Sequence, residues 1–513
     1  MSSSPMDRKN YKCPCCNNPW GAATGEFFAK LCQTCDDSTT SASPNDKPIS
    51  RDNIDPSVLP STNFYQYSNG KWLQNNPIPS GYPNWNNFLI LHTKSQENLK
   101  TILEGLREGN GSGTECTEEE AKVATFFAAA MDEATIEAAG VEPVRPILQV
   151  VDKAVAAHMN GAKAELAEQL GLMALEFGIS FFFSIGVSPD NDNTDHSILQ
   201  VSQGGLGLPD RDYYFDETKQ DQREAYKDAA AFMLTLLADP SATEATEENK
   251  AMAIKVFDLE KSLAEKHMTK TENRDPHATF NKMIVTDFVN TTGNGSFDFV
   301  AYLEAATGKT AHEGLGEINI RNVEALKRVA EVISSVDDAT LEYYLRWHVV
   351  KSCAPYLSQA LVQAHFDFYE KTLMGTQEIK PRWKRAMAFT ETALGEALGK
   401  LYCAKYFDET SKERALKVVE KVRQALEERL KEVDWMKADS TRAEALKKMS
   451  KFGVKIGYPD KWTDYGSLVI TAEMSFLDMV MASRKFDRLQ DIKEMNAPTD
   501  KLKWFMTPQT INA

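Results

Sequence analysis

Apolar residues recur every three or four positions along most of the chain, which is the period of an amphipathic helix. The stretch 117–140 shows the pattern with both of its ends marked. It opens with Thr117 and Glu120, the pair that forms a capping box at a helix N-terminus, and it closes on Gly140. The same periodicity predicts further helices over 162–177, 220–238, 247–266, 322–352, 358–373, 382–402, 410–433 and 441–453.

The stretch 410–433 also carries apolar residues at helical spacing. Thr410 and Glu413 repeat the capping-box pattern at its start. The apolar residues at helical spacing are Leu416, Val419, Val422, Leu426, Leu430 and Val433. The stretch therefore predicts a long helix with one apolar stripe.

Strand signals are few. The segments "GISFFFSIGV" (178–187) and "SILQVSQGG" (197–205) flank the turn-rich "SPDNDNTD" (188–195), which predicts one β-hairpin. The last segment, "KWFMTPQTINA" (503–513), reads as the beginning of another strand. The predicted fold class is therefore mainly α with minor β.

The charge balance argues against several classes of partner. The chain has 58 Lys and Arg against 74 Asp and Glu, a net charge of −16, which disfavours nucleic acid and anionic membranes as partners. The most apolar run, 179–187, is far shorter than the roughly 20 residues of a membrane-spanning helix. The N-terminal "MSSSPMDRKNYKCPCC" has no apolar segment typical of a secretory signal. We therefore expect a cytoplasmic protein without a membrane span.

The N-terminal region contains a cysteine cluster that suggests a metal site. Cys13 and Cys16 are separated by two residues, as are Cys32 and Cys35, and two such pairs can place four thiolates around one Zn²⁺. We predict a small structural zinc module over 1–36, followed by a Ser/Asp/Pro-rich linker over 37–54. A disordered tail with free thiols is the alternative.

A catalytic zinc motif is absent from the sequence. No two of the eight histidines are four residues apart, so no helix can present an HExxH pair. The only His-Glu dipeptide, His312-Glu313, has Gly at position 316 and lies in a loop-like stretch. In "QGGLGLPDRDYY" (203–214), Asp210, Arg211 and Asp212 form either a local ion-pair lock or a catalytic carboxylate pair.

Several long motifs occur in the order found in one family of enzymes. The chain resembles the neprilysin-like zinc metallopeptidases, which include neprilysin, the endothelin-converting enzymes and the bacterial oligopeptidase O, over about 55–513. The motifs that carry the resemblance are "NFYQYSNGKWLQNNPIPSGYPNWNNFLIL" (63–91), "VSQGGLGLPDRDYYFDE" (201–217), "KPRWKRAMAFTETALGEALGKLYCAKYF" (380–407), "KIGYPDKWTDYGSLVI" (455–470) and "WFMTPQTINA" (504–513).

The resemblance implies a two-lobed peptidase. A helical cap lobe would cover about 110–470, and the flanks 55–105 and 471–513 would be incomplete pieces of the thermolysin-like lobe. In this family the zinc ligands and the general base follow an N-A-Y-F motif, of which this chain has only Asn512 and Ala513. These two residues match the family's edge strand, which binds the substrate peptide by strand addition.

Two departures bear on specificity. Asn84 and His92 lie near positions where animal members carry arginines that bind the substrate's C-terminal carboxylate. The release of dipeptides is therefore not implied for this chain.

We thus expect the N-terminal, truncated portion of a zinc metalloendopeptidase that acts on oligopeptides. The 513 residues alone should be inactive, because the zinc ligands and the rest of the catalytic part are missing. The alternative is a catalytically inactive paralogue that acts as a peptide- or protein-binding module. A third reading makes the cysteine module an interaction site.

Overall fold

The computed structural model describes residues 50–107, 117–292 and 295–512. Two compact units divide the chain, Met1–Ile78 and Pro79–Ala513. The described part of the first unit contains the short helix η2 (Arg51–Asn53) and helix α2 (Phe64–Asn75). Asn63 begins α2 by accepting a hydrogen bond from the backbone N–H of Gln66.

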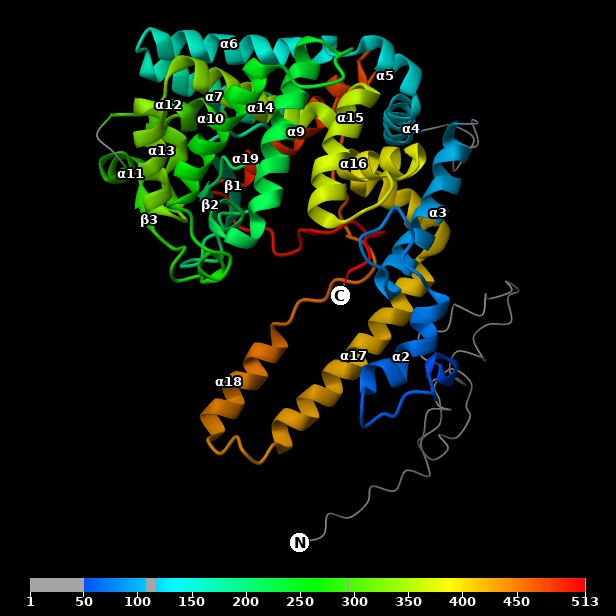
Figure 1. The fold of residues 1–513 in the computed structure, drawn as a ribbon. Coiled ribbons are helices and arrows are strands. Elements are labelled where there is room, and N and C mark those ends of the chain that lie inside the picture. The colour runs from blue at the N-terminus through cyan, green and yellow to red at the C-terminus, as the bar shows by residue number, and fades with distance from the viewer. Residues whose placement is uncertain (1–49, 108–116, 293–294, 513) are drawn as a thin grey trace. The chain divides into compact units, whose positions relative to one another are not determined.

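Helices dominate the second unit and confirm the mainly α fold class (Figure 1). Its α-helices are α3 (Asn87–Arg107), α4 (Glu118–Met131), α5 (Glu133–Ala139), α6 (Arg145–Met159), α7 (Lys163–Phe177), α8 (Asp212–Phe215), α9 (Gln220–Ala238), α10 (Glu247–Ala264), α11 (Val285–Thr292), α12 (Phe299–Thr307), α13 (Val323–Ser335), α14 (Asp338–Cys353), α15 (Gln359–Phe366), α16 (Arg382–Tyr406), α17 (Glu409–Glu432), α18 (Asp439–Ser450) and α19 (Phe476–Glu494). Shorter turns of 3-10 or π helix are η3 (Glu142–Val144), η4 (Glu217–Lys219), η5 (Glu272–Arg274), η6 (Ala311–Leu315), η7 (Ala354–Tyr356) and η8 (Asp367–Thr372).

Several of these helices are shorter than the pattern predicted. The stretch 117–140 forms two helices, because the side chain of Asp132 accepts a hydrogen bond from the N–H of Thr135 and starts α5. The capping box at Thr117 and Glu120 is present, as predicted. The stretch 322–352 is divided in the same way, since Asp337 caps the beginning of α14.

A small sheet lies among the helices. The predicted hairpin is confirmed by β1 (Phe183–Pro189) and β2 (Ser197–Gln203), which pair antiparallel. Two strands that the sequence did not reveal, β3 (Lys282–Ile284) and β4 (Glu317–Ile320), complete the order β1-β2-β4-β3. With three and four residues each, these strands are too short to show the alternation that marks a strand in sequence.

The core of the second unit runs between the helices and one face of this sheet. Helix α7 contacts both α6 and α12, and α19 contacts α7 and β1 (Figure 1). Trp347 and Tyr344 on α14 and Phe126 on α4 are among its largest fully buried side chains. Helices distant in sequence therefore share one apolar interior.

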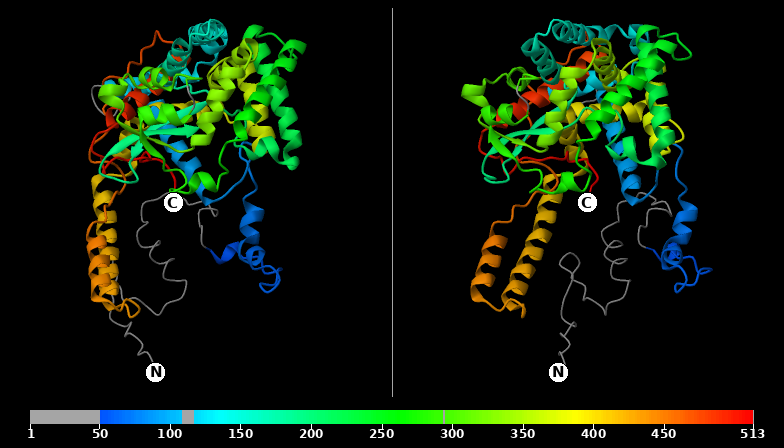
Figure 2. Two further views of the ribbon diagram at one scale, coloured as in Figure 1. Left: turned by 90° about the vertical axis from the view of Figure 1, so that its left-hand side faces the viewer. Right: turned by 60° about the vertical axis from the view of Figure 1, so that its left-hand side comes forward.

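Helices α17 and α18 pack against each other as a hairpin that extends away from the other helices of this unit (Figures 1 and 2). The predicted capping box at Thr410 and Glu413 is wrong. Helix α17 is capped two residues earlier, because the carboxylate of Asp408 accepts a hydrogen bond from the N–H of Ser411. None of the residues of α17 is buried, so its apolar stripe is at most partly covered.

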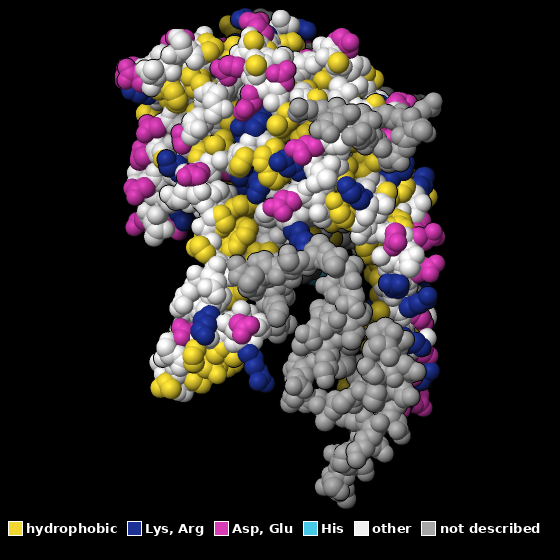
Figure 3. All heavy atoms as spheres, turned by 90° about the vertical axis from the view of Figure 1, so that its right-hand side faces the viewer, with side chains coloured by type: hydrophobic (Ala, Val, Ile, Leu, Met, Phe, Trp, Pro, Cys, Tyr) yellow, Lys and Arg dark blue, Asp and Glu magenta, His cyan; other side chains and the backbone are white. Residues whose placement is uncertain are grey.

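Charged side chains of both signs are interspersed over the surface of the described residues that Figure 3 presents. Within the described ranges, no helix is both long and apolar enough to cross a membrane.

Candidate functional site

The segment that ends at the predicted substrate-binding residues crosses from the sheet to helices α3 and α16. It leaves β2 through backbone hydrogen bonds between Ser197 and both Asn496 and Ala497. It then reaches α16, where the Gln509 side chain is 2% exposed and donates to the carbonyl of Gly395 over 3.1 Å. From α3, the Ser95 hydroxyl donates to the Gln509 carbonyl over 3.3 Å. The segment is thus docked between two helices.

The segment does not form the strand that the sequence suggested. Residues 504–512 contain only turns and irregular backbone. A β-strand needs a neighbouring strand for its hydrogen bonds, and the described sheet consists of β1 to β4 only. The backbone of Gln509 instead accepts a hydrogen bond from a side chain of α3.

Two glycines of α16 allow the segment to approach the helix closely. A Cβ at Gly395 would lie 2.6 Å from the Thr507 methyl carbon, and one at Gly399 would lie 2.7 Å from Pro508 Cδ. The helix is also interrupted next to Gly395, because Leu394 has non-helical backbone angles of φ −137° and ψ 36°. The two glycines of "LGEALG" (394–399) thus leave room for the segment to pack against α16.

A cavity of about 330 Å³ lies beside this docked segment. We call it the α3–α16 cavity, because its polar residues come mainly from α3, α15 and α16. Its polar lining includes His92, Gln96, His365, Glu370, Lys380, Lys384, Arg385 and Glu391. Its apolar lining includes Pro355, Tyr356, Val362, Phe366 and Phe389. Such a mixture of apolar surface and convergent polar groups is typical of a binding pocket.

Glu391 links the cavity to the docked segment. Burial raises the pKa of its carboxyl to about 7, and a hydrogen bond with the Gln509 side chain opposes the rise. The ordinary pKa of a glutamate carboxyl is 4.5. Because the pKa of Glu391 is about 7 instead, the carboxyl is divided between its neutral and ionised forms close to pH 7. A carboxyl that titrates near neutrality in a cavity is a candidate functional group.

The two imidazoles of the cavity are neutral at pH 7. Burial lowers the pKa of His92, and the positive charges of Lys380 and Lys384 lower it further. Burial also lowers the pKa of His365 to about 4, with help from Lys351. Neutral imidazoles can each donate one hydrogen bond and accept another, so they suit polar rather than charged groups.

Gln96 leaves an unused acceptor in the cavity. The residue is 5% exposed, and its Oε1 atom is buried without a hydrogen-bond partner among the described residues. A buried polar atom without a partner is rare in a folded protein and calls for an explanation. A bound group that donates a hydrogen bond would satisfy it.

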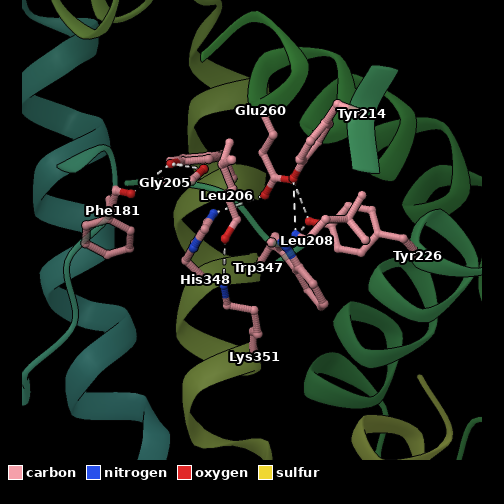
Figure 4. A network of polar contacts seen from close by, with 12 residues as sticks. Phe181, Gly205, Leu206, Leu208, Tyr214, Tyr226, Glu260, Trp347, His348 and Lys351 are labelled. Carbon is pink, nitrogen blue, oxygen red and sulfur yellow. Dashed lines mark hydrogen bonds and ion pairs between the residues drawn. The ribbon is translucent and has the colours of Figure 1, made fainter. Parts of the chain in front are cut away.

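The glycine-rich motif 203–214 forms part of a buried polar network rather than a catalytic pair (Figure 4). The hydroxyls of Tyr214 and Tyr226 each donate to Glu260 over 2.7 Å, and Glu260 is 0% exposed. His348 Nε2 lies 3.1 Å from the second oxygen of Glu260. The network joins the motif to α9, α10 and α14.

The charged residues of this motif form the local ion-pair lock. Asp210 pairs with Lys270 over 2.8 Å and accepts a hydrogen bond from the N–H of Asp212 over 2.8 Å. Arg211 is 3.9 Å from Asp212 and donates to the carbonyl of Ala264 over 3.5 Å. Because the carboxylates already contact cationic and backbone groups, the motif is better explained as a structural ion-pair lock than as a catalytic carboxylate pair.

The remaining predicted site residues are only partly described. Asn512 is exposed, and its amide nitrogen is 3.2 Å from Met506 Sδ. Ala513 and the four cysteines Cys13, Cys16, Cys32 and Cys35 lie outside the described residues. Within those residues, no group of three or more His, Cys, Asp or Glu side chains could hold a metal ion.

Sequence reasoning missed Gln96 and Glu391. A signal for Glu391 was present, because it interrupts the apolar and small residues of "AMAFTETALG" (386–395) on a predicted helix. Nothing in the sequence shows that this position faces α3, which is almost 300 residues away along the chain.

Comparison with known proteins points to a single group of enzymes. The sequence profile of peptidase family M13 matches residues 60–459. Rat endothelin-converting enzyme 1 is 27% identical over 471 residues, which are 90% of this chain and 59% of that protein. Mouse membrane metallo-endopeptidase-like 1 is 26% identical and is 62% covered. The chain therefore spans about three fifths of the length of the curated relatives it matches.

Solved structures agree with this result. The structure of the zinc metalloprotease Zmp1 of Mycobacterium tuberculosis in complex with an inhibitor is similar to 91% of this chain, with a TM-score of 0.79 and 28% identity, and 67% of that chain is covered. PepO of Lactobacillus rhamnosis has a TM-score of 0.73 at 19% identity over 89% of this chain and 68% of its own, which shows a common fold.

Proposed function

Because the chain belongs to peptidase family M13, we propose that it is the N-terminal, peptide-binding part of a zinc metalloendopeptidase that hydrolyses oligopeptides. The observation that carries this proposal is the link between the α3–α16 cavity and Gln509 of the docked segment that leads to Asn512. Glu391 belongs to the cavity lining and hydrogen-bonds Gln509. A peptide held near Asn512 would thus have a cavity for one of its side chains within a few residues.

The chemistry of the cavity supports a peptide as ligand. Its apolar wall suits the body of a substrate side chain, whereas Gln96 offers an acceptor and Lys384 offers a donor. The Asn512 amide can both donate to and accept from a peptide backbone, which is what strand addition requires. We infer that Asn512 and Ala513 bind the substrate backbone and that the cavity binds a side chain.

The catalytic step needs groups that the 513 residues do not contain. When bound, a catalytic zinc ion would polarise the scissile carbonyl and activate water. The sequence has no HExxH pair, so we propose that residues outside the printed sequence supply these zinc ligands. The cysteines at 13, 16, 32 and 35 would provide a closed, structural zinc site.

A direct assay tests whether this chain binds peptides without hydrolysing them. The purified 513-residue chain is mixed with a library of oligopeptides and added zinc, and both binding and hydrolysis are measured. We expect peptides to bind without chelator-sensitive hydrolysis, and we expect Asn512→Ala to weaken binding. Hydrolysis that a chelator abolishes would disprove the predicted inactivity, and a lack of peptide binding would disprove the proposed role.

The second candidate is a stand-alone binding module, which the absence of HExxH favours equally. Sequencing the transcript beyond the codon for Ala513 separates the two. An in-frame HExxH supports the enzyme part, whereas an immediate stop codon supports the module.

A further inference from the structure

A second opening lies at the N-terminal end of α16. This cleft of about 620 Å³, which we call the α16 cleft, is lined by Glu133, Glu137, Gln359, Lys380, Arg382 and Arg385, among others. Lys380 and Arg385 also line the α3–α16 cavity, but Arg382 and Glu133 line only the α16 cleft. Nothing in the proposed peptidase function uses the cleft.

The two arginines of the cleft are held in place by the protein. Arg382 Nε donates to the carbonyl of Ala130 over 2.5 Å, and its guanidinium lies 5.9 Å from the ring centre of Phe476. Arg385 Nε donates to the carbonyl of Lys380 over 3.2 Å. Side chains anchored in this way lose little freedom when they bind a ligand.

Each arginine nevertheless keeps one buried nitrogen without an acceptor. Arg382 Nη2 and Arg385 Nη1 have no hydrogen-bond partner among the described residues. A buried charged donor without an acceptor is unfavourable, so two of them in one cleft indicate that an acceptor is missing.

The charges around the cleft favour an anion as that acceptor. Lys380, Arg382 and Arg385 contribute three positive charges, and the positive end of the 25-residue helix α16 adds to them. Burial, together with the charge of Arg385, lowers the pKa of Arg382 to about 10. The positive charges of the cleft therefore repel one another.

Two carboxylates also line the cleft and must be counted against an anion. Glu133 lies 3.3 Å from Arg385 Nη2, and its side chain is 54% exposed to water. Glu137 accepts a hydrogen bond from the N–H of Gln359 over 2.7 Å, at the start of α15. Neither carboxylate has an ion pair or hydrogen bond with Arg382 among the described residues, but the charge of Glu133 raises the pKa of Arg382 and offsets part of the positive charge there.

We propose that the α16 cleft binds a small oxyanion, a carboxylate or a phosphate, between Arg382 and Arg385. Both groups offer the planar pair of acceptor oxygens that guanidinium nitrogens recognise. The two sources differ in shape and charge, which the test below uses to tell them apart.

Binding is measured by calorimetry on the full 513-residue chain, with inorganic phosphate and with acetate, against chloride at matched ionic strength. We expect at least one of the two oxyanions to bind. Arg382→Gln should weaken binding about tenfold or more, because it removes a charged donor. Lys400→Gln on the same helix is the matched control, since Lys400 lines neither the cleft nor the α3–α16 cavity and pairs with Glu119 at the surface.

A second variant keeps the test valid if Arg382→Gln does not fold. Glu133→Gln removes the competing carboxylate from an exposed position and should strengthen binding several-fold, because Arg385 is then freed. Binding of phosphate alone identifies a tetrahedral anion as the ligand, and binding of acetate alone identifies a carboxylate. The proposal is overturned if neither oxyanion binds, or if Glu133→Gln and Arg382→Gln leave the affinity of the wild type unchanged.

Discussion

The carboxyl of Glu391 makes the free energy of unfolding decrease as the pH rises. Its folded-state pKa of about 7 lies above its ordinary value of 4.5, so the folded chain holds this proton more tightly than the unfolded chain does. The free energy of unfolding should therefore fall as the pH rises from about 4.5 to about 7 on account of this group. The loss is complete about one pH unit above the folded-state pKa, where the carboxyl is ionised in both states.

Glu391→Gln should remove this dependence. The neutral amide resembles the protonated carboxyl, so the variant should equal the wild type at or below about pH 4.5 and exceed its stability at pH 8 by about 3 kcal/mol. Urea unfolding at several pH values measures the difference. Glu428→Gln on the surface of α17 is the control and should follow the wild type. A constant difference across this range would contradict the assignment.

Glu260 should be among the most sensitive positions of the core. Glu260→Ala leaves the hydroxyls of Tyr214 and Tyr226 buried without their acceptor, which should lower the free energy of unfolding by about 3 to 5 kcal/mol. Tyr214→Phe removes only one of these bonds and should cost about 1 to 2 kcal/mol. Denaturant unfolding gives both values.

A tyrosine–glutamate pair on the surface provides the comparison. Tyr343 donates to Glu248 over 3.1 Å in an exposed position. Tyr343→Phe should therefore change stability by less than about 0.5 kcal/mol. Equal losses for Tyr343→Phe and Tyr214→Phe would show that the buried network contributes no more than a surface contact.

At the scale of elements, α16 provides the surface on which the segment 504–512 packs. A Cβ at Gly399 would lie 2.7 Å from both Pro508 Cδ and Gln509 Oε1, so Gly399→Ala should displace the segment while the helix itself stays intact. Faster amide hydrogen exchange in 504–512 would report this displacement, and peptide binding should weaken with it. We expect the stability cost to be about 1 to 3 kcal/mol.

Gly453→Ala is the matched control for this variant, because a Cβ there would meet no atom within 4 Å. Its exchange pattern should equal that of the wild type. Undisturbed protection of 504–512 in Gly399→Ala would mean that the segment does not depend on its contact with α16.

At the scale of the whole molecule, the candidate site joins parts that are far apart in sequence. Ser95 comes from α3, Gly395 from α16 and Gln509 from the terminal segment, and all three belong to the second unit. The α3–α16 cavity therefore exists only when this unit is folded. The chain spans about three fifths of the length of the curated relatives it matches, so hydrolysis of oligopeptides stays a proposal for this chain.

Some predictions remain untested at this scale. The zinc module of Cys13, Cys16, Cys32 and Cys35 and the role of Ala513 lie outside the described residues. The boundaries of the predicted lobes and the cytoplasmic location also stay predictions.

The sequence by itself determined the features that depend on neighbours along the chain. The helical class followed from apolar periodicity, the β1–β2 hairpin from its turn residues, and the start of α4 from Thr117 and Glu120. The family followed from long motifs in a fixed order. Periodicity, turns and caps act within a few residues, so their signals are readable locally.

Only the tertiary structure decided what depends on distant contacts. It divided the stretch 117–140 at Asp132 and placed β4 parallel to β2. It also turned the expected terminal strand into a segment docked on α16, and brought Gln96 and Glu391 to one cavity. The physical reason is the same in each case. Hydrogen-bond partners, burial and the resulting pKa values are set by residues brought together from separate parts of the chain, which no local pattern encodes.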